Sequence, residues 1–170
     1  MRALRDKFKP NSDLTQTTRW SELYGSAEGF GITRLADSLE KPVVVIANDS
    51  RRMKLLQEEI AFFIRDHSTA PLLSLSDWEC LPYDVVSPQP EVISDRLRTL
   101  AQIPHLERGI LLSTVPALMQ RLPPSEYISG HSFFLETGQI VDPENLRIRL
   151  QAAGYLAVSQ VLCQGEYAIR

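Results

Sequence analysis

The sequence predicts an α/β fold in which a parallel sheet with flanking helices precedes the start of a small α+β domain. Three short apolar runs, at residues 42–47, 71–75 and 109–113, have the length and composition of buried strands. Segments with helical spacing separate them, and this alternation implies parallel strands joined by right-handed crossovers. The alternation stops after two prolines at 123 and 124, so we expect domains at 1–125 and 126–170.

The composition places the chain among globular proteins. Of its 170 residues 44% are hydrophobic and 23% are charged, and the net charge is only −3, which excludes a disordered chain. No apolar run approaches the roughly 18 residues of a membrane span, and no apolar run follows the charged N-terminus. Two cysteines do not make a disulfide framework, so we expect a cytoplasmic protein without membrane contact.

The first forty residues are expected to hold two helices around a loop. Asp13 is a typical cap for a helix over 14–24, and Gly25 is a typical stop. Small residues over 25–31 predict a loop, and a short helix is expected over 32–39. Five basic and two acidic side chains make residues 1–20 basic, which fits either a solvated tail or a nucleic-acid-binding arm.

The sheet and its helices follow. The unbroken run 42–47 predicts a strand buried on both faces, with Val44 and Ile46 in the core. Apolar residues at helical spacing predict a helix over 50–64, and a second strand is expected at 71–75. A proline-bearing loop at 76–90, a helix at 91–103, a strand at 109–113 and a short helix capped by Thr114 complete this region.

The last 45 residues have a different pattern. Residues 131–136 alternate like a strand, and Asp142 starts a helix that Gly154 ends. Residues 155–163 and 166–169 are typical of a hairpin that turns at Gln164-Gly165. Arg170 ends the chain inside this hairpin, so we interpret the sequence as a fragment of a longer protein.

No residue pattern predicts catalysis. The segment Gly25–Gly31 is the only candidate phosphate loop, but it lacks the Gly-Lys-Ser/Thr that holds phosphate and magnesium, and Glu28 would repel phosphate. It is either a connecting loop or an unusual nucleotide site. The three histidines have no ligand partners at metal-binding spacing, and Cys80 has no base near it in sequence. Trp78 and Tyr83, in the long loop, either pack onto the sheet or form a binding face.

Several motifs in this order resemble the bacterial transcription-repair coupling factors over about residues 20–170. The motifs are Asp77-Trp78-Glu79-Cys80-Leu81-Pro82-Tyr83-Asp84, Ser87-Pro88, Ile93-Ser94-Asp95-Arg96-Leu97, Arg108-Gly109-Ile110-Leu111-Leu112, Leu118-Met119-Gln120-Arg121, Ala153-Gly154-Tyr155 and Gly165-Glu166-Tyr167-Ala168. The resemblance identifies the chain with the N-terminal region of that family, which is similar to the damage-recognition protein UvrB.

The resemblance implies a first domain like a degenerate RecA-like helicase half, and then the start of a domain that docks onto UvrA. It implies partner-binding roles for Arg170, Tyr167 and Glu166, and Arg170 falls on an arginine that the family uses to contact UvrA. It also implies that ATP, magnesium, RNA polymerase and DNA are bound by other parts of the full-length factor, so this region has no cofactor and no catalytic residue.

Two departures from UvrB favour an adaptor. The lysine of the phosphate loop is missing, and the loop after Tyr83 is short and has no further aromatic residue with which to stack on bases. We therefore expect a non-catalytic region that recruits UvrA to stalled RNA polymerase in nucleotide excision repair. The alternatives are the nucleotide-binding half of a helicase-like ATPase, or a DNA-binding module. The latter would use the basic N-terminus together with Arg34, Arg51, Arg52 and Lys54.

Overall fold

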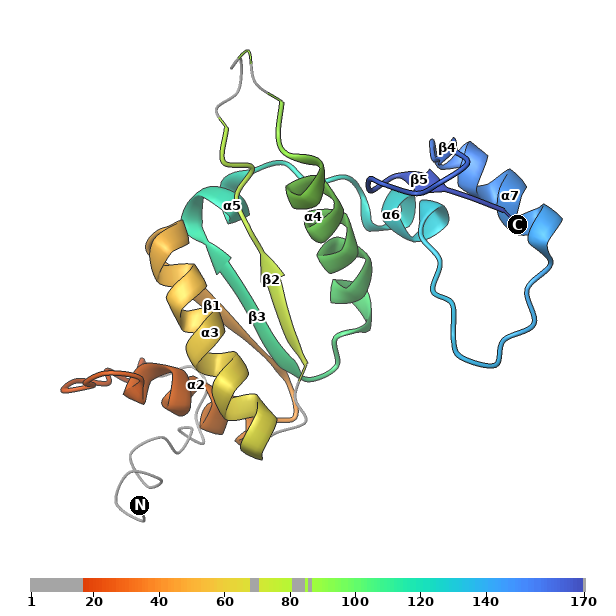
Figure 1. Cartoon of the computed structure of the whole chain (residues 1–170). Helices are drawn as coiled ribbons and strands as arrows, with labels where there is room; N and C mark the ends of the chain where they lie inside the picture. Colours follow the sequence, from red (N-terminus) through yellow and green to blue (C-terminus); the bar gives the residue numbers. More distant parts are fainter. Residues whose placement is uncertain (1–16, 68–70, 81–84, 86, 170) are drawn as a thin grey trace.

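A three-stranded parallel sheet forms the centre of the molecule (Figure 1). The computed structural model describes residues 17–67, 71–80, 85 and 87–169. The strands β1 (Pro42–Ala47), β2 (Leu72–Leu75) and β3 (Gly109–Thr114) lie in the order β1-β3-β2, so the last strand in sequence is central. Leu111 of β3 pairs with Val44 on one side and with Leu73 on the other. The prediction of parallel strands is confirmed.

Helices α2 (Ala27–Ser38) and α3 (Ser50–His67) cover one face of this sheet. Apolar side chains from both helices and from β1 and β3 form the core there: Ile32, Ala36, Ala47, Met53, Leu56, Ile60, Ile110 and Leu112. The helical spacing of the α3 residues therefore correctly predicted its buried side. Helix α4 (Pro90–Gln102) packs along β2, where the Thr99 hydroxyl donates to the carbonyl of Ser74 at 2.7 Å.

The sequence was misleading about β1. Burial alternates along this strand, and the side chains of Val44 and Ile46 are each 54% exposed. The prediction that both are buried in a central strand is wrong. β1 has a single neighbouring strand among the described residues, and its core contacts come from Val43, Val45 and Ala47 on the other face. A strand at the edge with helices on one side buries only every second residue.

The start of the chain also differs from its predicted structure. Residues 17–24 form no helix, so the predicted helix over 14–24 is wrong in its described part; residues 13–16 lie outside the described residues. The predicted loop over 25–31 is mostly helical, because α2 begins at Ala27 and contains Gly29. A Cβ at Gly29 would lie 2.6 Å from Cβ of Glu59, so the glycine is needed for close packing of α2 on α3.

Most other elements of the first region are as predicted. The helices at 50–64 and 91–103 and the strands at 71–75 and 109–113 are found within a few residues of their expected bounds. A single 3-10 turn, η1 (Ile103–His105), links α4 to the segment before β3. Thr114 caps α5 (Val115–Met119), and its hydroxyl accepts from the backbone N–H of Ala117 at 3.4 Å.

Residues 125–169 contain α6 (Ser125–His131), α7 (Pro143–Ala152), β4 (Leu156–Ala157) and β5 (Glu166–Tyr167). Asp142 caps α7 as predicted, and Gly154 follows its end with φ +86°. Helix α6 contacts α4, so the first element after residue 124 is joined to the sheet domain through a helix–helix contact. The boundary near residue 125 stays a prediction.

Two predictions for this region are wrong. Residues 132–136 form no strand, because His131 ends α6 and the segment after it is irregular. β4 and β5 pair in parallel, with Leu156 opposite Glu166 and Ala157 opposite Tyr167, so they are not a hairpin. Parallel pairing requires the intervening segment to cross back before β5 begins, and the Leu156 N–H donates to the Gly165 carbonyl at 2.9 Å.

Candidate functional site

An ion-pair cluster occupies the start of α2, where a nucleotide loop was considered. Arg52 of α3 pairs with Glu28 in the first turn of α2 and with Glu59, whose Oε1 lies 3.4 Å from Nη1. The hydrogen bond that Arg52 donates to the Glu28 carboxylate is the main reason why the pKa of Arg52 is raised above its ordinary value. A carboxylate in the first turn of a helix also suits the positive end of the helix dipole. The start of α2 is thus occupied by the chain's own charges.

A second cluster lies beyond the carboxyl end of β2. The side chain of Arg96, in α4, is only 1% exposed, and its Cζ lies 4.2 Å from the ring centroid of Trp78. The guanidinium also donates to the carbonyl of Ser76. Burial lowers the pKa of Arg96, and the negative charge of Asp77 partly opposes that shift. Trp78 is half-buried and packs against Arg96 of α4 rather than against a strand, and its role as a binding face stays a prediction. Tyr83 lies outside the described residues.

Asp77 connects this cluster to the segment after α5. Its carboxylate accepts from the side-chain amide of Gln120 and from the backbone N–H of Trp78 at 2.8 Å. Three of the motifs that carry the family resemblance therefore meet in one place, and their polar groups hold α4, β2 and α5 together. Sequence reasoning missed the role of Arg96. Its signal was the spacing of Val92, Arg96 and Thr99, which puts an arginine on the buried side of a helix.

The structure places two of the three predicted partner-binding residues on β5. Glu166 Oε2 accepts from the backbone N–H of Leu162 at 2.9 Å and of Cys163 at 3.0 Å, and these bonds lower its pKa. Tyr167 is 8% exposed, and its buried hydroxyl has no hydrogen-bond partner. Glu166 therefore orders the turn before β5, while Tyr167 faces inward. Arg170 lies outside the described residues, so the partner-binding roles stay predictions.

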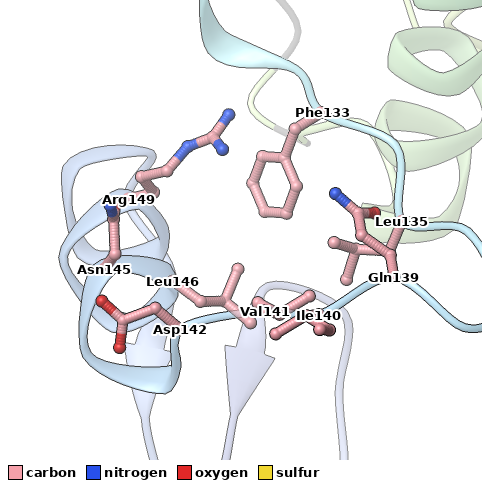
Figure 2. A pocket seen from close by; sticks show the side chains of 9 residues that line it. All are labelled: Phe133, Leu135, Gln139, Ile140, Val141, Asp142, Asn145, Leu146 and Arg149. Carbon is pink, nitrogen blue, oxygen red and sulfur yellow. The ribbon is translucent and has the colours of Figure 1, made fainter.

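A small pocket lies between α7 and the irregular segment before it (Figure 2). Its volume is about 170 Å³, less than the ~300 Å³ or more of typical small-molecule sites. Apolar side chains line most of it: Phe133, Leu135, Ile140, Val141 and Leu146. The guanidinium of Arg149 lies at one side, with Cζ 4.4 Å from the centroid of the Phe133 ring. This pocket suits one or two side chains of another molecule.

A larger hollow, of about 470 Å³, lies between α3 and α4 beside β2. Four of its charged groups are paired, because Lys54 Nζ lies 3.4 Å from Glu79 and Arg98 lies 2.9 Å from Asp95, and Glu91 lines it as well. No group of three or more histidine, cysteine, aspartate or glutamate residues in the described part of the chain is arranged to hold a metal ion. Among the described helices none has the length and apolar character to cross a bilayer.

The fold defines the chain as an α/β protein with a small parallel sheet, in which the motif residues Asp77, Trp78 and Arg96 join neighbouring elements. No family model matches the chain. It is 40% identical over 149 residues to the transcription-repair-coupling factor of Escherichia coli. The aligned region covers 88% of this chain and 13% of that protein. It is 35% identical over 144 residues to the Haemophilus influenzae factor and 25% identical over 148 residues to the Bacillus subtilis factor.

The chain therefore corresponds to a segment of a transcription-repair-coupling factor, and the resemblance found in its motifs is confirmed. These matches cover 85–88% of the chain but only 12–13% of each relative's length.

Proposed function

We propose that the chain is a non-catalytic adaptor region of a transcription-repair-coupling factor, acting in transcription-coupled nucleotide excision repair in the cytoplasm. In this proposal it recruits UvrA to stalled RNA polymerase. The observation that carries the proposal is the 40% identity to the Escherichia coli factor over most of the chain. The full-length factor would bind RNA polymerase, DNA, ATP and magnesium through other parts.

The start of α2 supports a non-catalytic role. A phosphate cradle needs free backbone amides and a lysine. Here the segment is already helical, with the Phe30 N–H donating to the carbonyl of Ser26 at 3.1 Å. The carboxylate of Glu28 lies in the first helical turn and pairs with Arg52. Phosphate binding there would require this ion pair to open, which favours an adaptor over a nucleotide-binding half of an ATPase.

The segment 161–167 supports a docking role. Glu166 fixes the turn by accepting two backbone N–H groups, while the side chains of Val161 and Leu162 are 51% and 79% exposed. An ordered turn that presents apolar side chains is suited to contact with another protein. Arg170, three residues after Tyr167, would add a planar guanidinium that grips a carboxylate at two points.

The test is calorimetry with purified UvrA, using this chain and a longer chain that continues past Arg170. We expect weak binding by the 170-residue chain, because Arg170 has no following residues to hold it, and tight binding by the longer one. In the longer chain Arg170→Glu should weaken binding by at least ~2 kcal/mol, with an unchanged melting temperature. Arg51→Glu, an exposed charge reversal on α3, is the matched control.

Two outcomes would overturn the proposal. Equal UvrA affinity for the parent and the Arg170→Glu chain would remove Arg170 from the interface, and no binding by either length would remove the adaptor role. Binding to duplex DNA whose affinity falls steeply with salt would instead support the DNA-binding alternative.

A further inference from the structure

The pocket beside α7 has a chemistry that selects among ligands. Its floor is apolar, and Ile140 at its edge is 98% exposed. Arg149 contacts the face of Phe133, and within the described residues it has no carboxylate within salt-bridge distance. By contrast, Arg98, which lines the larger hollow between α3 and α4, is paired with Asp95. Arg149 therefore offers a charge that the chain itself does not neutralise.

Gln139 adds a second donor to the same pocket. Its side-chain oxygen accepts from the backbone N–H of Glu136 at 3.2 Å, so the amide oxygen is engaged outside the pocket. The amide nitrogen points toward the ring of Phe133, on the other side of which lies Arg149 in this view (Figure 2). The carboxylate of Asp142, which also lines the pocket, accepts from the Glu144 N–H at 3.2 Å as the cap of α7. Donors thus face the pocket, and its one carboxylate is engaged with the helix.

We infer that this pocket docks a segment of a protein partner in which an aspartate or glutamate stands next to an aliphatic residue. The aliphatic side chain fills the space between Phe133 and Leu146, and the carboxylate accepts from Arg149 and Gln139. A volume of about 170 Å³ suits side chains of a peptide better than a whole small molecule. That the ligand is a protein rests on the proposed function. That its segment is acidic and aliphatic is inferred from the residues that line the pocket.

The unmatched positive charge decides between occupants. A purely apolar segment would bury the guanidinium of Arg149 without a hydrogen-bond partner, and burying an unpaired charge costs free energy. A basic segment would be repelled by the same group. An acidic and aliphatic segment would place its aliphatic side chain on the apolar residues and its carboxylate against Arg149. A charge-assisted hydrogen bond to arginine is about twice as strong as a neutral one.

The experiment uses the 170-residue chain labelled with ¹⁵N and two capped peptides, acetyl-Gly-Leu-Asp-Leu-Gly-amide and its Asn counterpart. We expect the Asp peptide to shift the side-chain NMR signals of Gln139, Asn145 and Arg149, and to bind about tenfold more tightly than the Asn peptide. Arg149→Gln should abolish that preference. Arg147→Gln, on the same helix but in an ion pair with Glu144, is the matched control and should keep it.

Several outcomes would overturn the inference. They are equal affinity for the two peptides, an equal effect of Arg149→Gln and Arg147→Gln, or no shift at these signals. Sedimentation that shows a dimer dissociated by Arg149→Gln would assign the pocket to a second copy of the chain instead. Circular dichroism melts of both variants check that each is folded.

The peptide result and the UvrA result are separable. UvrA binding by the longer chain that is insensitive to Arg149→Gln, together with no peptide preference, leaves the adaptor proposal in place and removes this pocket from it. A peptide preference that depends on Arg149, with no UvrA binding, supports the pocket chemistry and overturns the proposed partner.

Discussion

The guanidinium of Arg96 lies over the indole ring of Trp78, with Cζ 4.2 Å from the ring centroid, and this contact joins α4 to the loop after β2. Both residues belong to motifs by which the chain resembles the coupling factors, yet Arg96 is almost completely buried. Their place in the fold gives these motif residues a structural role, since no partner can reach a cation that is 1% exposed.

Arg96→Met should lower the free energy of unfolding by about 2–4 kcal/mol. The substitution keeps most of the aliphatic length, but it removes the contact with Trp78 and leaves the Ser76 carbonyl without its donor. Denaturant unfolding followed by tryptophan fluorescence measures the change. Arg98→Met, on the exposed side of α4, should cost less than about 1 kcal/mol. Similar losses for both variants would contradict the role of Arg96.

Gly29→Ala should destabilise the fold although alanine is the better helix former. The new Cβ would lie 2.6 Å from Cβ of Glu59, so α2 and α3 must separate, at a cost of about 1–3 kcal/mol. Gly130→Ala in α6 is the control, because its Cβ would meet nothing within 4 Å, and it should stabilise by up to about 1 kcal/mol. Thermal melts that rank the two variants in the opposite order would refute close packing at Gly29.

The central position of β3 predicts which strand tolerates truncation. Ile110→Ala should cost about 2–5 kcal/mol, because Ile110 is fully buried between the two other strands. Ile46→Ala should cost much less, since that side chain is 54% exposed on an edge strand. Urea unfolding of the two variants makes the comparison. A larger loss for Ile46→Ala would show that the open face of β1 is covered.

Addition of ATP and magnesium should not raise the melting temperature of this chain. A ligand at 100 times its Kd stabilises a protein by about 2.7 kcal/mol, which a thermal shift readily detects. Glu28 and Arg52 neutralise each other at the start of α2, where a phosphate would have to bind. A clear ATP-dependent rise that is lost on mutation of Gly31 would instead support a nucleotide site.

The turn before β5 should depend on pH through Glu166. Two backbone N–H groups hold its pKa below the ordinary value, so the turn is fully stabilised above the unfolded pKa of about 4.3. That stabilisation is lost as the pH falls through the lower, folded pKa. NMR titration of the Leu162 and Cys163 amides should show a midpoint below about 4.3, and Glu166→Gln should show none. A midpoint at or above that value would contradict the two bonds.

The sequence predicted the sheet domain where local signals agreed with tertiary structure. Helix α3 and strand β3 were identified because apolar spacing, caps and strand length agreed. The prediction that Val44 and Ile46 are buried was wrong, because an unbroken apolar run is compatible both with a central strand and with an edge strand that has one open face. Strand order decides between them, and it depends on pairings between distant segments.

The candidate sites were predicted less well, for a related reason. Glu166 and Tyr167 were selected through the family resemblance. The turn that Glu166 stabilises depends on hydrogen bonds from the backbone of residues 162 and 163, and no sequence pattern predicts these bonds. Small residues over 25–31 predicted a loop, whereas contact with Glu59 makes Gly29 a packing position within a helix. The pocket at Arg149 is lined partly by an irregular segment, which has no periodicity to read.

Because β3 is the central strand but the last in sequence, β1 has no strand to pair with until β3 has been synthesised. Pro42 pairs with Gly109, so the ribosome must add roughly 70 more residues before β1 has any strand to pair with. At about 5–20 residues per second this takes roughly 3–14 s. The apolar residues of β1 lack their partner strand throughout that interval, and those of β2 lack it for the later part. The nascent chain therefore exposes an aggregation-prone strand for seconds, and its folding as a unit begins only when Thr114 has left the ribosome.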